Sequence, residues 1–283
     1  MAAFELVRPS TVEEALAHVK AEEGAGVVVL AGGTDLLLDL DSGRSTPKKV
    51  VSLRRLPWRS LAWEGAGLRV GSTLPLRTLE LDPGVSARFP ALGEAIRAVG
   101  GPSLRRQATL GGNVGRAAPA SDLLPVLLAL DAEVELVGEG GARSVPIDGF
   151  LRASRRTAIA PGELIRSVLF PEPRPSAYLW QRVRPANDIS QVAVAAAYSP
   201  SRGAWHVALG GVPPRPSLVP ASAQALVTER PAPESIEHAA RALAAWPGLV
   251  SDRRATEEYR RELVGVLLRR AVLRASEATR GAP

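Results

Sequence analysis

The sequence predicts an α+β chain made of three consecutive units, and three observations support this class. Short apolar runs typical of strands alternate with segments of helical periodicity along the whole chain. A Pro-rich segment, 171–177, separates the last unit from the rest. The length of 283 residues is enough for a sizeable core. The expected units are 1–55, 56–170 and 178–283.

The first unit is expected to contain a helix, a strand and a glycine-rich turn. Ser10 and Glu13 match the capping box that begins a helix, and the apolar residues of 12–19 then fall on one helical face. The run 27–30 is apolar throughout, which predicts a buried strand. That strand leads directly into 31–35, called here the first glycine turn.

The second unit is expected to surround another glycine-rich segment. Strands are predicted at 68–71 and 132–136, the latter with the alternation of a half-exposed strand, and a helix is predicted at 89–99. Between them lies 109–113, called here the second glycine turn.

The third unit follows the Pro-rich segment and is expected to combine strands with two helices. Strands are predicted at 189–198 and 205–209, and helices near 234–245 and 254–275. The residues that the last helix is expected to bury are Tyr259, Leu263, Val266, Leu267 and Leu273.

Composition excludes several classes of function. The net charge of +6 comes almost entirely from Arg, but the basic pairs are dispersed among carboxylates, which argues against a nucleic-acid partner. Since the chain has no cysteine, it can form no disulfide and supply no thiolate to zinc or to an iron–sulfur cluster. The three histidines are scattered, so no metal site is expected, and no residues are singled out as catalytic.

No apolar run approaches the ~18 residues that span a bilayer, and the first residues do not resemble a signal peptide. These features predict a cytoplasmic protein without a transmembrane segment.

The two glycine turns are the main functional signal. Glycine lets the main chain approach a ligand closely, and successive amides in such turns form anion-binding nests. Thr34, Thr109 and Asn113 add polar side chains. Two such turns brought together would hold a diphosphate from both sides, although neither has the spacing of a Rossmann site.

The residues alone leave alternatives open. Each glycine pair could equally form an ordinary tight turn. Asp35 could only cap the following helix, and Ser121 or Asp122 could cap the helix that contains Leu124 and Leu127.

Both turns also resemble a known family. The run 29–36 and the run 108–113 with its extension 117–123 resemble the two FAD-binding turns of the flavoprotein subunits of molybdenum hydroxylases, the carbon monoxide dehydrogenase and xanthine dehydrogenase family. Further similarities lie at 184–189, 209–212 and 252–260, so the resemblance covers essentially the whole chain in order.

The resemblance implies a vanillyl-alcohol-oxidase/PCMH-type fold, with two sub-domains that hold FAD and a C-terminal α/β domain. The glycine turns would contact the FAD diphosphate mainly through main-chain atoms. Asp122, supported by Ser121, would hydrogen-bond a cofactor hydroxyl or amide, and Ile165 would pack on the cofactor. Where the family commonly has a basic residue before 184, Gln181 or Arg182 would take its place. The implied cofactor-binding residues are Leu30, Ala31, Gly32, Gly33, Thr34, Asp35, Leu36, Thr109, Leu110, Gly111, Gly112, Asn113, Ser121, Asp122, Ile165 and Gln181.

The function that the resemblance implies is electron transfer. Electrons from [2Fe–2S] clusters on a small partner chain would pass through FAD to NAD, a quinone or another acceptor. The substrate would react on a large partner chain that carries the molybdenum cofactor, in a heterohexamer of two heterotrimers. The alternatives are a free-standing FAD-dependent oxidoreductase of related fold and a non-catalytic module that has lost the cofactor.

Overall fold

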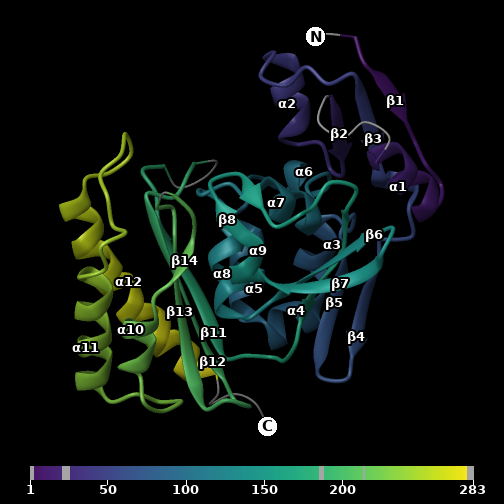
Figure 1. Cartoon of the computed structure of the whole chain (residues 1–283). Helices are drawn as coiled ribbons and strands as arrows, with labels where there is room; N and C mark the ends of the chain where they lie inside the picture. Colours follow the sequence, from purple (N-terminus) through teal and green to yellow (C-terminus); the bar gives the residue numbers. More distant parts are fainter. Residues whose placement is uncertain (1–2, 21–25, 185–187, 213, 279–283) are drawn as a thin grey trace.

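The computed structural model describes residues 3–20, 26–184, 188–212 and 214–278. Three larger sheets follow one another along the chain, and Figure 1 shows them from the upper right, through the centre, to the left of the molecule. Mixed helices and strands confirm the α+β class. No helix in the described ranges has both the length and the apolar character to cross a membrane.

The first sheet is parallel, with strand order β1-β3-β2. Its elements are β1 (Glu5–Val7), α1 (Val12–Lys20), β2 (Val27–Leu30), α2 (Leu36–Asp41), β3 (Lys49–Ser52) and the 3₁₀ turn η1 (Leu53–Arg55).

Two expectations for this unit need correction. The helix cap lies one residue later than predicted, because the Thr11 hydroxyl, and not that of Ser10, accepts a hydrogen bond from the Glu14 amide at 3.2 Å. The strand predicted as buried is only partly so, and Val29 is 39% exposed. The reason is topological: β2 is an edge strand, so no neighbouring strand covers its outer side.

The second sheet is antiparallel, with order β4-β5-β10-β6-β7, and helices pack over one of its faces (Figure 1). The predicted strands and helix in this unit are confirmed, with ends that differ by no more than about two residues. Its elements are β4 (Leu61–Glu64), β5 (Gly67–Gly71), α3 (Leu76–Leu81), α4 (Pro83–Arg88), α5 (Pro90–Ala98), α6 (Pro102–Arg105), α7 (Leu110–Arg116), α8 (Leu123–Ala129), β6 (Glu133–Gly138), β7 (Gly141–Pro146), α9 (Ile147–Phe150), the hairpin β8 (Leu151–Ala153) and β9 (Arg156–Thr157), and β10 (Leu164–Phe170).

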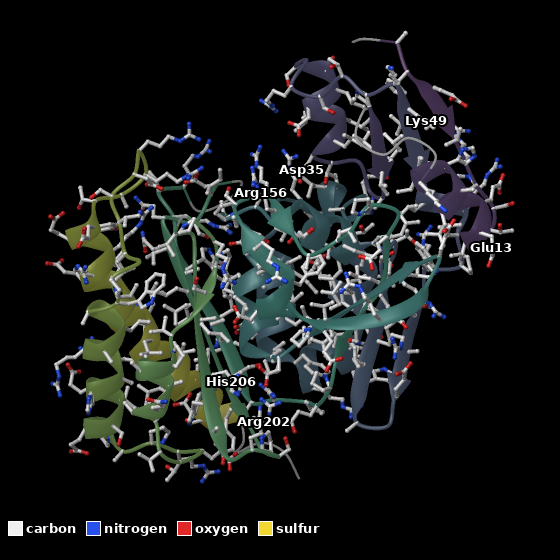
Figure 2. The ribbon with its side chains drawn as sticks, in the orientation of Figure 1. Glu13, Asp35, Lys49, Arg156, Arg202 and His206 are labelled. Carbon is white, nitrogen blue, oxygen red and sulfur yellow. The ribbon has the colours of Figure 1, made fainter. Side chains whose placement is uncertain are left out.

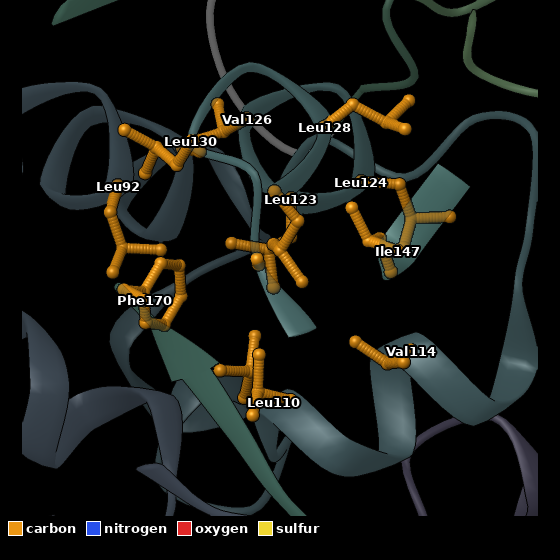
Figure 3. Close-up of a cluster of buried hydrophobic side chains, with 14 of the residues drawn as sticks. Leu92, Leu110, Val114, Leu123, Leu124, Val126, Leu128, Leu130, Ile147 and Phe170 are labelled. Atoms are coloured by element: carbon orange, nitrogen blue, oxygen red, sulfur yellow. The ribbon is translucent and has the colours of Figure 1, made fainter. Parts of the chain in front are cut away.

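The core of this unit fixes the helices that follow the second glycine turn. Figure 3 shows Leu110 and Val114 of α7 pointing into the same cluster as Leu123 of α8 and Phe170 of β10. All four side chains are fully buried. Burying an apolar side chain of this size contributes about 1.5–3 kcal/mol, so α7 is held firmly against the sheet.

The third sheet is antiparallel, with order β11-β12-β13-β14. Helix α12 packs on one of its faces, and α5 and α8 of the second unit contact strands of the same sheet (Figure 1). Its elements are β11 (Ser176–Gln181), β12 (Val192–Ser199), β13 (Ala204–Gly210), β14 (Ser217–Leu218), α10 (Pro220–Gln224), α11 (Pro233–Ala244) and α12 (Glu257–Ala278). The two predicted strands and two predicted helices correspond to β12, β13, α11 and α12.

The Pro-rich segment is not a free linker. Strand β11 already begins inside it, at Ser176, and Arg174 is 1% exposed. The Arg174 guanidinium donates to the Ala129 carbonyl at 3.0 Å and to the Asp131 carboxylate at 2.8 Å. Arg174 therefore anchors the connection to the end of α8.

The predicted buried face of α12 is partly wrong. Leu267 is buried and Leu263 partly buried, but Tyr259, Val266 and Leu273 are 40%, 36% and 53% exposed. The buried stripe consists of Arg260, Val264, Leu267, Leu268, Ala271, Val272 and Ala275. The prediction relied on the large apolar side chains. Alanines and an arginine are not recognised as buried from the sequence, so the predicted face was partly wrong.

Candidate functional site

The two glycine turns meet in space. A Cβ built on Gly32 would lie 2.1 Å from the Gln107 carbonyl oxygen and 3.1 Å from the Ala108 Cα, just before the second turn. A Cβ on Gly112 would lie 3.6 Å from the Ala31 Cβ. The first turn thus rests on the main chain that enters the second, and only glycine at position 32 permits the contact.

The first glycine turn joins β2 to α2 and keeps main-chain donors available. Gly33 has φ +85°, a left-handed conformation that suits glycine. Within the described residues, Gly33, Thr34 and Asp35 donate no turn or loop main-chain hydrogen bond, whereas the Leu37 amide donates to the Gly33 carbonyl at 3.0 Å. Asp35 is exposed and its side chain does not cap α2, so the capping alternative for Asp35 is wrong.

The second glycine turn forms the start of α7. Thr109 is the N-cap residue, and its hydroxyl accepts a hydrogen bond from the Gly112 amide at 3.0 Å. Gly111 lies against Ser72, since a Cβ on it would fall 2.4 Å from the Ser72 Cβ. Leu110 points into the core, so only its main chain could face a ligand (Figure 3).

A hydrogen bond ties the second turn to the start of α8. The Ser121 hydroxyl donates to Asn113 Oδ1 at 2.6 Å and accepts from the Leu123 amide at 3.2 Å. Ser121 therefore caps α8. Asp122 makes no side-chain cap hydrogen bond, because its carboxylate points elsewhere.

The Asp122 carboxylate joins the second unit to the third. Oδ1 accepts from the Tyr178 hydroxyl at 2.7 Å and from the Ser190 hydroxyl at 2.9 Å. Oδ2 forms an ion pair with Arg182 at 2.7 Å, and the Arg182 side chain is only 6% exposed. Burial, followed by the neighbouring Asp122 charge, raises the pKa of Tyr178 well above its ordinary value, so its hydroxyl stays protonated and donates.

Gln181 lies beside this network. Its Nε2 donates to the Arg182 carbonyl at 2.9 Å. Arg182 lies over the Trp180 ring, 5.3 Å from its centroid, and also donates to the Ala98 carbonyl at 3.1 Å. Of the similarity at 184–189, residues 185–187 lie outside the described residues.

The helices behind the two turns are joined by an ion pair. Arg116, at the end of α7, contacts Asp39 of α2 at 2.7 Å. Arg44 contacts the other Asp39 oxygen at 2.8 Å. The hydrogen bond from Arg44 lowers the pKa of Asp39, burial opposes this, and the charge of Arg116 lowers it further, so that the net shift is downward.

The remaining predicted residue, Ile165, faces α7. A Cβ on Gly115 would lie 3.4 Å from Ile165 Cδ1. The β8–β9 hairpin closes the end of the same helix, since the Arg155 amide donates to the Ala117 carbonyl at 3.0 Å. Figure 2 labels Asp35 of the first turn and Arg156 of this hairpin, which lie near each other in that view.

A basic cleft borders the first turn. It has a volume of about 300 Å³ and is lined by Leu30 and Ser52, at the ends of two parallel strands. Arg8, Arg54 and Arg55 also line it. Its positive charge favours an anionic ligand nearby.

Sequence reasoning did not find Tyr178, Ser190, Asp39 or Arg116. Tyr178 and Ser190 lie 56 and 68 residues from Asp122, so no local spacing joins them. The one available signal was the polar character of Asp39 among the leucines of 36–40.

Family comparisons agree with this geometry. The FAD binding domain in molybdopterin dehydrogenase matches residues 2–173, and the CO dehydrogenase flavoprotein C-terminal domain matches residues 177–275. The chain belongs to the family of FAD-binding medium subunits of molybdenum hydroxylases. It is accordingly an FAD-dependent oxidoreductase subunit, and the expected resemblance is confirmed.

Full-length relatives support the assignment. The chain is 29% identical to the carbon monoxide dehydrogenase medium chain of Afipia carboxidovorans over 278 residues, which is 96% of each protein. It is 28% identical to the nicotine 6-hydroxylase medium subunit of Paenarthrobacter nicotinovorans, over 98% of this chain and 99% of that one. A solved Cu,Mo-CO dehydrogenase in its cyanide-inactivated form matches with a TM-score of 0.90 and 28% identity, over 98% of this chain and 99% of that chain.

The residues present fit FAD. Amides of the first turn are available as donors, and the start of α7 lies against that turn. Gly112 and Gly115 leave part of the α7 surface without side chains. An anionic diphosphate needs such bare, donor-rich main chain.

Proposed function

We propose that the two glycine turns hold the FAD diphosphate between them and that the chain transfers electrons within a molybdenum hydroxylase. The observation that carries the proposal is the contact between Gly32 and the Gln107 carbonyl, which brings the turns together. The proposed cofactor contacts are residues 30–36 and 109–113, with Ser121, Asp122, Ile165 and Gln181.

The main chain is proposed to bind the diphosphate. The amides of Gly33, Thr34 and Asp35 would donate to phosphate oxygens. The cleft lined by Arg8, Arg54 and Arg55 supplies a positive field next to the same turn. These amides and charges orient an anion without any catalytic side chain.

Asp122 is proposed to contact a cofactor hydroxyl or amide. A carboxylate has about four acceptor positions. Tyr178, Ser190 and Arg182 occupy three of them, which leaves one on Oδ2. The three protein donors hold the carboxylate in one orientation, so the remaining lone pair is preorganised.

The cofactor supplies the redox chemistry, and the chain supplies binding, orientation and electrostatics. Because the sequence has no cysteine, the [2Fe–2S] clusters are assigned to a small partner chain and the molybdenum cofactor to a large one. Electrons would leave this chain for NAD, a quinone or another acceptor. The proposed assembly is a heterohexamer of two heterotrimers, and the proposed sub-domains are 1–55, 56–170 and 178–283.

The first test is flavin retention. The chain is expressed alone and with the chains that co-purify from its source, FAD is added, and the visible spectrum is recorded after gel filtration. We expect the absorbance of bound flavin and, in the native complex, molybdenum and iron by metal analysis. Absence of bound flavin in both preparations would overturn the proposal.

The second test addresses the turns. A Cβ on Gly112 would lie 3.0 Å from the Thr109 hydroxyl oxygen and 3.6 Å from the Ala31 Cβ, so Gly112→Val crowds both turns and should abolish flavin retention. Far-ultraviolet circular dichroism of the same variant checks that the chain stays folded. Gly140→Val is the matched control, because a Cβ there meets nothing within 4 Å. Equal flavin retention in the two variants would refute the assigned turns.

A further inference from the structure

An ion pair lies directly behind the contact between the turns. Asp39 is four residues after Asp35 on α2, and Arg116 is four residues after Gly112 on α7. Residues four apart lie on the same face of a helix. The Asp39–Arg116 pair therefore lies one helical turn behind the two glycine turns, and at 2.7 Å it joins the unit of the first sheet to the unit of the second.

The pair is well placed to resist separation of the turns. The Asp39 side chain is 8% exposed and that of Arg116 is 27% exposed, so water screens the pair only partly. Arg44 binds the second carboxylate oxygen and keeps Asp39 from rotating away. Arg116 occupies the last turn of α7, where a cation also complements the helix dipole.

We infer that the Asp39–Arg116 ion pair is a latch that sets the gap between the glycine turns and thereby the retention of FAD. The inference rests on the proposed function, in which these turns hold the diphosphate. Asp39 and Arg116 are positioning residues, because they act through the main chain of 31–35 and 109–113.

A second ion pair provides an internal control. Lys20 of α1 and Glu139, in the turn between β6 and β7, also join the first unit to the second, at 2.6 Å. Their side chains are 56% and 64% exposed, and neither belongs to a helix that follows a glycine turn. Loss of this pair removes a link between the same units without touching the turns.

The experiment compares FAD release with stability. Arg116→Gln, Arg116→Lys, Asp39→Asn and Glu139→Gln are prepared in the full chain. The dissociation constant and release rate of FAD are measured by recovery of flavin fluorescence, and the Tm of each FAD-free chain is measured separately. We expect Arg116→Gln and Asp39→Asn to weaken FAD binding about tenfold, which corresponds to about 1.4 kcal/mol.

Arg116→Lys keeps the positive charge and should retain most of the affinity for FAD. Glu139→Gln removes an exposed ion pair and should change the dissociation constant of FAD by less than about twofold. Because Asp39→Asn already removes the Asp39–Arg116 contact, adding Arg116→Gln to it should weaken FAD binding no further.

Several outcomes would overturn the latch. One is unchanged FAD release in Arg116→Gln and Asp39→Asn while the wild-type chain binds FAD normally. Another is a loss of Tm in the FAD-free variants with release rates like those of Glu139→Gln, which would indicate a purely structural pair. Failure of the wild-type chain to bind FAD would instead refute the proposed function on which the latch rests.

Discussion

Gly32 leaves no space for a side chain, because the Gln107 carbonyl oxygen occupies the position next to its missing Cβ, 2.1 Å away. Two segments that lie far apart in the sequence are pressed together at this point. Main-chain contact at this point thus brings the two halves of the proposed diphosphate site together.

Gly32→Ala should therefore push the turns apart. We expect a loss of about 1–3 kcal/mol in the free energy of unfolding, the usual cost of overpacking, together with weaker FAD binding. Denaturant unfolding and flavin fluorescence measure the two effects. In Gly140→Ala, where the new methyl group meets open space, both quantities should stay at the wild-type level. A Gly32→Ala variant that binds FAD normally would contradict the proposed contact.

Asp122→Ala should leave the Arg182 guanidinium buried without its partner. Removing one member of a buried ion pair costs about 3–5 kcal/mol, and chemical denaturation would measure the loss. Adding Arg182→Met should recover part of the loss, because no uncompensated charge remains. Arg241→Gln, at a pair whose side chains are 69% and 41% exposed, should cost under about 0.5 kcal/mol. Equal losses at the two sites would argue against the buried network.

Asp131 should make the free energy of unfolding depend on pH. Burial alone would raise the pKa of Asp131, but hydrogen bonds from His206 and Arg174 outweigh burial and lower it. Figure 2 labels His206 and Arg202, two partners of this carboxylate, at 3.0 Å and 2.9 Å. The Asp131 carboxyl therefore takes up a proton at a higher pH in the unfolded chain than in the folded chain. Its interactions stabilise the fold fully at pH values above the pKa of the unfolded chain, and this stabilisation is lost as the pH falls through the pKa of the folded chain.

The variant Asp131→Asn tests the direction of this pH dependence. Asn tolerates the positive φ of 49° at this position, so the backbone need not change. We expect a loss of about 2 kcal/mol near neutral pH, as for hydrogen bonds to a charged group. The difference from wild type should shrink below about pH 4. A difference in unfolding free energy that stays constant down to about pH 2 would contradict the prediction.

Two leucines of α12 test which face of the helix is buried. Leu268 is fully buried and Leu273 is 53% exposed. Leu268→Ala should cost about 2–5 kcal/mol through the cavity that it leaves. Leu273→Ala should change the unfolding free energy by no more than about 0.5 kcal/mol. The reverse order in thermal or denaturant unfolding would show that the helix is rotated.

Local patterns in the sequence were sufficient to predict many of the strands and helices and the position of the candidate site. Alternation and helical periodicity predicted the strand that contains Val70 and the helix that contains Ile96. The buried face of such an element is visible in the spacing of its own apolar residues. The glycine pairs at 32–33 and 111–112 identified the candidate site. Glycine has no Cβ, so the main chain at these positions can come close to a ligand or to another segment.

Patterns were less informative where burial depended on neighbours. The apolar strand 27–30 looked fully buried but became an edge strand. Helix α12 buries alanines and Arg260 in place of Tyr259 and Leu273, because the third sheet, and not residue size, selects its inner face.

The sequence by itself determined the α+β class, the family and two short segments able to approach an anion. Only the tertiary structure decided that these segments touch, that Asp122 binds Arg182 and that Asp39 meets Arg116. The physical reason is distance along the chain: periodicity and turn chemistry act within a few residues, whereas each of these contacts joins residues that are remote in sequence and exists only after the units pack.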